Sequence, residues 1–413
     1  MTSNIENARI FVVSELFYPE ETSTGYFVTR IAEGMARDAR VTAICSKPTY
    51  SERSVEVLAR ETHNDVEILR VRSTRLNKDN LFGRLINLVT FTISAAVCFG
   101  LRVRRGDTVL CLTNPPPLPM FVGLVAKLKG VRALLLVHDL YPEVLGVTGF
   151  LSERGLLYRA LYHLFSWTYQ LYDEVIVLGR DMQALVSKKL TDQQVPVVIP
   201  NWGDVAAVHP LPRSENPFAI EHGLNDKTVI QFSGNLGRTH DLESVIRVAN
   251  QFLHDPAICF LFVGYGGKAH LLGDLVGRNQ PSNLVFLPRQ PREMLGPMLA
   301  CADATIIAFM DGMLGVSVPS RMYNVMAAGV PIIALCHHQS ELALTVEELN
   351  CGWLLSVGDE AGLAELVRQI HSSKNSAGPS EAERRGENGR AGAQKFYSEA
   401  MVVDQFRKLV GNA

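Results

Sequence analysis

The sequence predicts two α/β domains, each a parallel sheet covered by helices on both faces. Its 413 residues exceed what one hydrophobic core of ordinary size can hold, so two domains are expected. Short β-branched runs alternate with helical stretches along nearly the whole chain, the order typical of doubly wound sheets. Proline and glycine within 200–204 end the last strand of the first half, which divides the chain into domains at 1–200 and 201–392.

The elements follow in order from these runs. The first domain is expected to contain strands at Ile10–Ser14, Val41–Cys45, Val66–Val71, Thr108–Thr113, Ala133–His138, Glu174–Leu178 and Val195–Ile199, with helices such as Tyr26–Arg37 and Leu156–Leu171. The second is expected to contain strands at Thr228–Ser233, Cys259–Val263, Leu284–Leu287, Ala304–Ala308, Pro331–Leu335 and Gly352–Ser356, with helices such as Leu242–Leu253, Arg292–Cys301 and Ser320–Ala328. Because the strand runs are continuously apolar, they indicate parallel sheets buried on both faces.

The end of the chain is expected to return to the body of the molecule. Residues Ser372–Asn388 are polar and predict a solvated loop or helix end. The stretch after them repeats apolar residues at helical spacing, and we predict one helix over 393–413 that packs back on the body of the protein.

Composition and charge exclude several classes of protein. Hydrophobic residues make up 47% and charged residues 20%, which is typical of a globular protein. The formal net charge is −2, from 40 Lys plus Arg against 42 Asp plus Glu, so no nucleic-acid partner is expected and an anionic ligand needs a local group of cations. The seven cysteines show no metal-ligand spacing and predict buried thiols in a reducing compartment. The polar N-terminus shows no signal-peptide pattern, so we expect a cytoplasmic protein.

One uncharged segment, Leu85–Leu101, is followed by the basic residues of Arg102–Arg105. Three interpretations stay open: a buried helix of the domain, a helix lying in one leaflet beside its basic flank, and a short membrane span. We predict peripheral contact with the inner face of the plasma membrane through this segment and its flank.

Two glycine-containing turns in the second half indicate a phosphate site. The first strand there ends in a turn with Gly234 and Arg238, which would offer amide groups and a cation to an anion. The second turn runs from Gly312 through a predicted cap at Ser317 to Arg321 in the first turn of a helix. Ordinary structural turns remain the alternative for each. The chain has no Asp-x-Asp, and we expect no metal and no cofactor, so arginines would neutralise a diphosphate.

Five motifs in order carry a resemblance to a known family. They are the segment Phe17–Tyr26, VHDLYPEV at Val137–Val144, VIPNWGD at Val198–Asp204, the glycine turn, and the stretch PSRMYNVMAAGVPIIA. Together they resemble the retaining glycosyltransferases of family four, of the type that assembles bacterial surface polysaccharides and lipid-linked sugars. The resemblance implies the GT-B fold, with two Rossmann-like domains facing a central cleft: an N-terminal acceptor domain and a C-terminal nucleotide-sugar domain. It also implies that the last helix, 393–413, crosses back to the first domain.

The resemblance also implies site residues. Catalytic roles fall to His138, Asp139, Arg238 and Arg321, with the two arginines clamping the diphosphate and His138 close to the transferred sugar; a structural histidine at a strand end is the alternative. The implied donor-binding residues are Gly25, Gly234, Asn235, Arg238, Tyr265, Arg289, Gly315, Val316, Ser317, Val318, Ser320, Arg321, Asn324 and Glu341.

The sequence departs from the family pattern at two places. Many members carry two glutamates separated by seven residues, and this chain has Val316 and Asn324 there. A common Arg–Lys pair of the first glycine turn is replaced by Asn235 and His240, so Arg238 would have to supply the cation. These changes bear on the identity of the sugar more than on the fold.

The predicted activity is metal-independent transfer of a hexosyl or N-acetylhexosaminyl unit, with retention, from a nucleotide diphosphate sugar. We expect a UDP-sugar rather than a GDP-sugar as donor and a polyprenyl-linked or other glycan acceptor, in polysaccharide biosynthesis for the cell envelope. Two alternatives stay open: a catalytically degenerate GT-B subunit that only binds, and a nucleotide-sugar epimerase that needs no acceptor.

Overall fold

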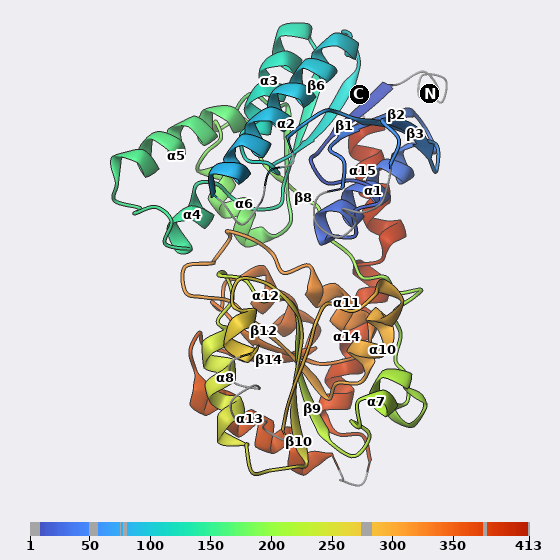
Figure 1. Ribbon diagram of the computed structural model, residues 1–413, viewed down its shortest axis with the longest axis vertical. Helices are drawn as coiled ribbons and strands as arrows, with labels where there is room; N and C mark the ends of the chain where they lie inside the picture. The colour runs from blue at the N-terminus through green and yellow to red at the C-terminus, as the bar shows by residue number, and fades with distance from the viewer. Residues whose placement is uncertain are drawn as a thin grey trace. The chain divides into compact units, whose positions relative to one another are not determined.

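The computed structural model describes residues 9–48, 57–74, 76, 81–273, 283–374 and 378–411 (Figure 1). The chain forms two compact units. The first unit contains Met1–Pro200, Gly315–Val318 and Ala400–Ala413, and the second contains Asn201–Leu314 and Pro319–Glu399. The prediction of two Rossmann-like α/β domains is confirmed, since each unit is built on one mostly or wholly parallel sheet.

The first unit is built on an eight-stranded sheet in the order β3-β4-β2-β1-β5-β6-β7-β8. Its strands are β1 (Arg9–Val13), β2 (Arg40–Cys45), β3 (Arg60–His63), β4 (Val66–Arg70), β5 (Thr108–Leu112), β6 (Arg132–Val137), β7 (Glu174–Val177) and β8 (Val197–Val198). The central strand β5 is buried along its full length, as its apolar run predicted.

An entirely parallel sheet was the wrong expectation for this unit, because β3 runs antiparallel to β4. Two residues with positive φ, Asn64 (45°) and Asp65 (64°), make the two-residue turn between the strands. Asparagine and aspartate tolerate this conformation, which suits a tight hairpin. The polar strand Arg60–His63 carries no apolar run and so gave no strand signal.

Helices of the first unit lie in two layers. They are α1 (Ser23–Met35), α2 (Leu81–Arg102), α3 (Leu118–Lys129), α4 (Glu143–Val147), α5 (Leu156–Tyr169), α6 (Arg180–Ser187) and α15 (Glu399–Gly411). Right-handed crossovers put α2, α3 and α5 on one face of the sheet and α1 on the other. Figure 1 shows α2, α3 and α5 together at one side of this unit and α15 beside α1.

Helix α2 is long and apolar enough to cross a membrane by length and composition: its window Leu85–Arg102 has a mean hydropathy of 1.7. A third of that window (33%) is buried inside the protein, and core helices of soluble proteins pass the same test. Phe91 and Phe99 are buried, and the Phe99 ring meets Phe11 of β1 edge-on at 5.6 Å. The inner side of α2 therefore packs on the sheet of its own unit.

The second unit is built on a six-stranded parallel sheet in the order β11-β10-β9-β12-β13-β14. Its strands are β9 (Thr228–Asn235), β10 (Ile258–Tyr265), β11 (Leu284–Leu287), β12 (Ala304–Ala308), β13 (Ile332–Leu335) and β14 (Gly352–Leu355). The order reverses between β9 and β12, which makes that point the topological switch where ligands bind in such sheets.

The helices of the second unit cover both faces of this sheet. They are η1 (Arg213–Glu215), α7 (Pro217–Glu221), α8 (Leu242–Gln251), η2 (Arg292–Met294), α10 (Leu295–Ala300), α11 (Arg321–Ala327), α12 (Glu341–Leu349), α13 (Glu360–Ser373) and α14 (Glu381–Phe396). The core under α8 and α13 joins buried apolar residues of both helices to those of β9, β10 and β12.

The C-terminal part of the chain differs from its prediction in two ways. The expected loop at 372–388 is largely helical, because Ser380 and Glu383 form a capping box that starts α14 inside it. The expected single helix over 393–413 is two helices, with α14 ending at Phe396 in the second unit and α15 beginning at Glu399.

Helix α15 is an integral part of the first unit. Gly34 of α1 lets the two helices approach so closely that an added Cβ would collide with Cγ1 of Val403. Arg407 forms an ion pair with Asp38 at 2.6 Å. Arg132 at the start of β6 donates to the carbonyl oxygens of the last turn, including that of Val410 at 3.1 Å.

Candidate active site

The second unit gathers polar groups where β9 and β10 end. Gly234 has φ = 121°, a region that favours glycine, and an added Cβ there would meet the guanidinium carbon of Arg321 at 3.4 Å. The register of the sheet pairs Gly234 with Gly264 and Asn235 with Tyr265. The structure thus brings four predicted donor-binding residues together at the carboxyl ends of β9 and β10: Gly234, Asn235, Tyr265 and Arg321.

Arg321 is the central cation of this cluster. It begins α11, and its Nη1 donates to the carbonyl oxygen of Ser233 at 2.7 Å. Its Nη2 contacts Nε2 of His240, and its guanidinium carbon lies 5.1 Å from the centre of the Phe232 ring. Burial lowers the pKa of Arg321 to about 10, so the side chain is cationic at neutral pH. An anion reaching the end of β9 would therefore meet a fixed positive charge.

His240 is the side-chain partner of the Arg321 guanidinium. Burial, together with the charges of Arg321 and Lys268, holds the pKa of His240 well below its usual range. The ring is therefore neutral and can accept a hydrogen bond from the guanidinium. Two residues before His240, Arg238 lies exposed on the same turn.

Lys268 is a cation of this cluster that the sequence analysis missed. Its Nζ donates to the carbonyl oxygen of His240 at 2.7 Å and forms an ion pair with Glu243 at 2.8 Å. It follows β10 directly after Gly266 and Gly267. A lysine after paired glycines at a strand end was the available signal, because such loops approach the neighbouring strand end closely.

The other predicted donor residues of the second unit follow different strands or make contacts of their own. Arg289 is exposed two residues past β11, at the edge of the sheet. Glu341 is buried at the start of α12 and accepts from Thr345 Oγ1 at 3.4 Å. The Oδ1 of Asn324 accepts from the backbone N–H of Asp204 at 2.9 Å, which ties α11 to the segment after β8.

The segment Gly315–Val318 differs from its prediction, because it packs within the first unit. The N–H of Gly315, expected to face phosphate, donates to Oδ2 of Asp181 at 3.1 Å. The carbonyl oxygen of Val316 accepts from the N–H of Leu140 at 2.9 Å. These backbone groups are engaged by protein partners, so the predicted amide cradle is not formed by Gly315.

The remaining members of that prediction divide between the two units. Ser317 forms an isolated antiparallel bridge with Asp139 in the first unit, and Val318 is buried beside it in the chain. Ser320 precedes α11 in the second unit, and its side chain makes no capping hydrogen bond to the helix. Ser317 is therefore not the cap of α11, contrary to the expectation.

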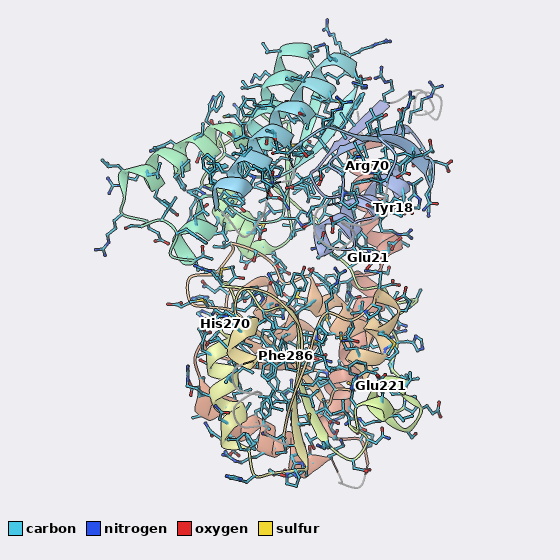
Figure 2. The ribbon with its side chains drawn as sticks, in the orientation of Figure 1. Tyr18, Glu21, Arg70, Glu221, His270 and Phe286 are labelled. Atoms are coloured by element: carbon cyan, nitrogen blue, oxygen red, sulfur yellow. The ribbon has the colours of Figure 1, made fainter. Side chains whose placement is uncertain are left out.

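Gly25, expected in the loop after the first strand, lies in the first turn of α1, and the chain around it is fixed by close contacts. Thr22 caps α1 by accepting from the N–H of Gly25 at 3.3 Å. An added Cβ at Gly25 would come within 2.5 Å of the Glu20 carbonyl oxygen, so only glycine fits there. Arg70, whose side chain is fully buried, donates to the carbonyl oxygen of Tyr18 at 2.8 Å, and Figure 2 shows these two residues in the same part of the first unit.

His138 follows the end of β6, where its N–H donates to Thr113 Oγ1 at 3.1 Å. Its Nε2 is buried and has no hydrogen-bond partner among the residues that the structure describes. Burial lowers the pKa of His138 to about 4, so the imidazole is neutral at physiological pH. A buried, unpaired ring nitrogen at a strand end favours a ligand partner over a purely structural histidine.

A buried ion pair near this strand end was also missed. Lys189, with a fully buried side chain, bonds Glu143 at 2.7 Å and lies 3.9 Å from the centre of the Tyr162 ring. Burial lowers the pKa of Lys189, although Glu143 opposes that shift. Its third contact is the carbonyl oxygen of Tyr141 at 3.3 Å, so Lys189 anchors α4 and α5 together.

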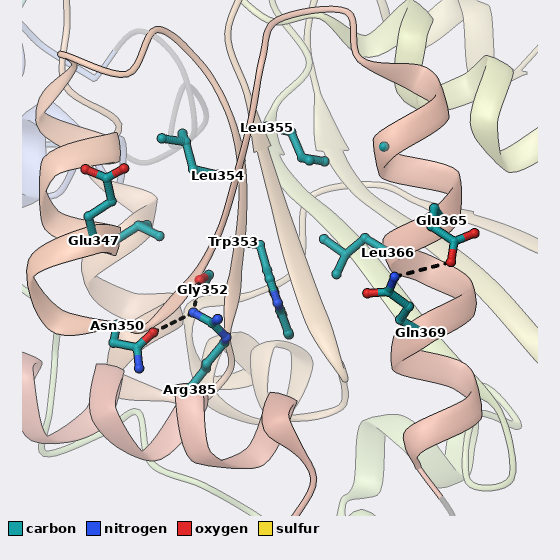
Figure 3. Close-up of a pocket in the computed structure, with 12 residues that line it drawn as sticks. Glu347, Asn350, Gly352, Trp353, Leu354, Leu355, Glu365, Leu366, Gln369 and Arg385 are labelled. Carbon is teal, nitrogen blue, oxygen red and sulfur yellow. Dashed lines mark hydrogen bonds between the residues drawn. The ribbon is translucent and has the colours of Figure 1, made fainter.

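A pocket of about 520 Å³ lies along β14, the edge strand of the second unit (Figure 3). Its single lining cation, Arg385, is bonded to Asn350 Oδ1 at 2.6 Å and lies 5.0 Å from the centre of the Trp353 ring. Glu347 and Glu365 also line it. Two acids against one engaged cation do not favour an anionic diphosphate, and none of the predicted site residues lines this pocket.

The described residues contain no group of three or more His, Cys, Asp or Glu side chains that could hold a metal ion. All seven cysteines are free, and burial raises the pKa of the Cys45 and Cys111 thiols to about 12. Those two thiols are therefore protonated and unreactive at neutral pH.

The chain forms two α/β domains with a cationic cluster at the strand ends of the second, and comparison with known proteins gives the family. The family described as "Glycosyl transferase 4-like domain" matches residues 24–202, and "Glycosyl transferases group 1" matches residues 214–392. The chain is 33% identical over 408 residues to "Probable glycosyltransferase WbjE" of Pseudomonas aeruginosa, covering 98% of each chain. The chain belongs to this glycosyltransferase family.

Solved structures agree on the fold. The Anabaena protein HepE, solved in complex with UDP-glucose, matches with a TM-score of 0.72 at 12% identity and covers 98% of this chain and 100% of its own. WaaG, a glycosyltransferase involved in lipopolysaccharide biosynthesis, matches with a TM-score of 0.69 at 13% identity and the same coverage. Similarity at this identity establishes the GT-B type of fold alone.

Proposed function

We propose that this glycosyltransferase takes its sugar from a UDP-sugar and binds the diphosphate at the carboxyl ends of β9 and β10. The observation that carries the proposal is the placement of Arg321 against Gly234, with His240 and Lys268 behind it. The glycine turn has Asn235 and His240 in place of the Arg–Lys pair common in the family. Arg321 of α11 supplies the positive charge that this turn lacks. HepE, whose structure holds UDP-glucose, supports a uridine nucleotide.

The proposed reaction is metal-independent and retains the configuration at the anomeric carbon. The positive charge of Arg321 and Lys268, together with the exposed Arg238, stabilises the leaving UDP. A phosphate oxygen of the leaving group accepts the proton of the acceptor hydroxyl as the new glycosidic bond forms. His138 is neutral, so its ring can donate or accept a hydrogen bond to the donor sugar without adding charge.

The proposed acceptor is a lipid-linked sugar of a cell-envelope polysaccharide, and the enzyme works in the cytoplasm at the inner face of the plasma membrane. The apolar helix α2 with its basic flank at Arg102–Arg105 supports this placement. The part that WaaG plays in lipopolysaccharide biosynthesis supports an acceptor of the cell envelope. Sedimentation with anionic liposomes at low salt tests it, and a protein that stays in solution contradicts it.

One experiment tests the activity itself. The purified protein is incubated with UDP-hexoses, UDP-N-acetylhexosamines and GDP-hexoses, each with and without a diphospho-polyprenyl sugar, and products are identified by mass spectrometry. A lengthened lipid-linked sugar together with free UDP supports the proposal. Conversion of the donor without an acceptor would indicate an epimerase. Donor binding without any product would indicate a degenerate subunit, the reading that Val316 and Asn324 in place of glutamates favour.

A further inference from the structure

Exposed apolar side chains concentrate on one helical layer of the first unit. Of the 21 large hydrophobic residues that are exposed in the described part of the chain, 12 lie on α2, α3 and α5. On α2 they recur every three or four residues and so form one stripe: Phe82, Leu85, Val89, Ile93, Val97 and Leu101. The stripe faces away from the buried side of α2, where Phe91 and Phe99 pack on the domain.

The three helices are neighbours and form one continuous layer. Helix α2 packs against α3, and α3 packs against α5 (Figure 1). An added Cβ at Gly100 of α2 would lie 3.5 Å from Val125 of α3, which shows how closely the first two approach. The apolar side chains of α3 and α5 therefore extend the stripe of α2 into a surface. They are Phe121, Leu128, Leu156, Leu157, Leu164 and Trp167.

The charge of this layer has one sign. Helices α2, α3 and α5 contain no aspartate or glutamate, although the whole chain has 42 of them in 413 residues. Their exposed ends carry cations instead. Lys127 and Lys129 flank Leu128, which is 85% exposed, and Arg102 follows Leu101, which is 79% exposed. The side chain of Arg105 lies 3.5 Å from the Cβ position of Gly130, so the basic ends of α2 and α3 meet.

We propose that the outer face of the α2–α3–α5 layer docks on an anionic lipid bilayer, with the three helices lying in the plane of the interface. A soluble partner surface gives no reason to exclude acids from all three of these helices, whereas an anionic headgroup layer does. Exposed leucines beside lysine and arginine at the helix ends suit the boundary between headgroups and acyl chains. This proposal names the surface through which the protein would reach the membrane. It rests on the proposed function only where that function requires a lipid-linked acceptor.

The buried polar contacts of α2 favour docking over spanning. The side chain of Asn87 is buried, and it accepts from the N–H of Leu76 and donates to its carbonyl oxygen, both at 2.9 Å. A spanning helix would lose these bonds and the packing of Phe91 and Phe99, and it would leave the amide of Asn87 unsatisfied in hydrocarbon. Helix α2 can meet lipid with its exposed stripe while its inner face stays in the domain.

The test uses the full chain and vesicle flotation. Wild type is mixed with vesicles of phosphatidylcholine alone or of phosphatidylcholine with phosphatidylglycerol. The face variant Leu101→Gln/Leu128→Gln/Leu156→Gln changes one exposed leucine on each helix. The control Leu58→Gln/Val195→Gln/Ile220→Gln changes three residues that are more than half exposed and lie outside these three helices. UDP binding is measured on every variant.

The expected result is binding of wild type to the anionic vesicles, weakened at least about tenfold in the face variant and unchanged in the control. Arg159 is an exposed cation of α5. The charge variant Lys127→Gln/Lys129→Gln/Arg159→Gln should bind anionic vesicles about tenfold more weakly than the wild type, and the wild type should bind neutral vesicles weakly. Equal binding of wild type and face variant, or equal binding to both lipids, would overturn the proposal. The proposal would also be overturned if the wild type did not bind vesicles but formed, in sedimentation, a dimer that depends on the same leucines.

The two proposals fail separately. Loss of vesicle binding with normal UDP binding in the face variant supports the docking face and leaves the transferase proposal intact. Absence of UDP binding in the wild type, with normal flotation, counts against the transferase proposal alone.

Discussion

Replacing Arg321 with methionine should weaken UDP binding strongly without unfolding the protein. Methionine keeps the length of the side chain and its packing on Phe232 but removes the charge and the bonds to Ser233 and His240. A charge about 5 Å from a phosphate is worth roughly 3 kcal/mol at an effective dielectric constant near 20. Salt and partial exposure reduce this by about half, so we expect the Kd for UDP to rise between about tenfold and about a hundredfold.

The assay is isothermal titration calorimetry with UDP, with melting temperature as the check on folding. Arg368→Met is the matched control, since Arg368 also lies over a phenylalanine ring, at 5.4 Å from Phe252, but on α13 outside the cluster. It should bind UDP like the wild type. Arg321→Lys should fall between wild type and Arg321→Met, because lysine keeps the charge but not the planar pair of donors.

His240 gives a second arm of the same experiment. His240→Gln keeps an acceptor for the Arg321 guanidinium and should lose little affinity, whereas His240→Leu leaves the guanidinium unpaired on that side and should lose more. If Arg321→Met folds and binds UDP within about threefold of the wild type, the diphosphate does not bind beside Arg321. The placement of the donor site at β9 would then be refuted.

Three further predictions concern the first unit. In urea titrations, the contribution of His138 should lower the free energy of unfolding by about 2 kcal/mol between pH 8 and pH 5. Burial lowers the pKa of His138 to about 4 in the folded protein, so the unfolded chain takes up the proton first as the pH falls. A His138→Asn variant with an equally steep pH dependence would contradict this. Lys189→Met should cost about 3–5 kcal/mol by leaving the Glu143 carboxylate buried without its partner, and Lys189→Met/Glu143→Leu should recover most of it in the same titration; failure of the double variant to recover would show that the loss is not electrostatic. Gly34→Ala should lower stability by about 1–3 kcal/mol in thermal melts through its collision with Val403, and Gly34→Ala combined with Val403→Ala should restore it; an unchanged melting temperature for the single variant would show that the two helices can separate at no cost.

Sequence patterns predicted the sheets well because buried parallel strands are continuous apolar runs. Strand β5 is buried at every residue and lies where its run placed it. Strand β3 was missed, since its residues Arg60–His63 are exposed or half-buried and stabilised by pairing with β4 rather than by burial. The sequence contains the capping box of Ser380 and Glu383, which marks the start of a helix. The polar composition around it led to the prediction of a loop instead.

The candidate site was predictable where it depends on the topology of the sheet. Strand ends of a parallel sheet meet at one edge, so Gly234 and Tyr265 could be placed together from their positions after two strands. The paired glycines before Lys268 were a signal in the sequence, but the contact of Lys268 with His240 depends on the path of the loop after β10 and could not be predicted from it. The bond between Gly315 and Asp181 joins residues 134 positions apart, and it gives the glycine amide a partner that no motif could reveal.

The position of α15 constrains how the protein can be made. The first unit needs residues from both ends of the chain, because Val402 and Phe406 of the last helix are buried in it and Arg407 pairs with Asp38. During synthesis the intervening 201–399 region therefore emerges from the ribosome, and has time to fold, before the first unit can acquire its final helix. Loss of the last dozen residues would remove these buried side chains and expose the part of α1 around Gly34 that Val403 covers.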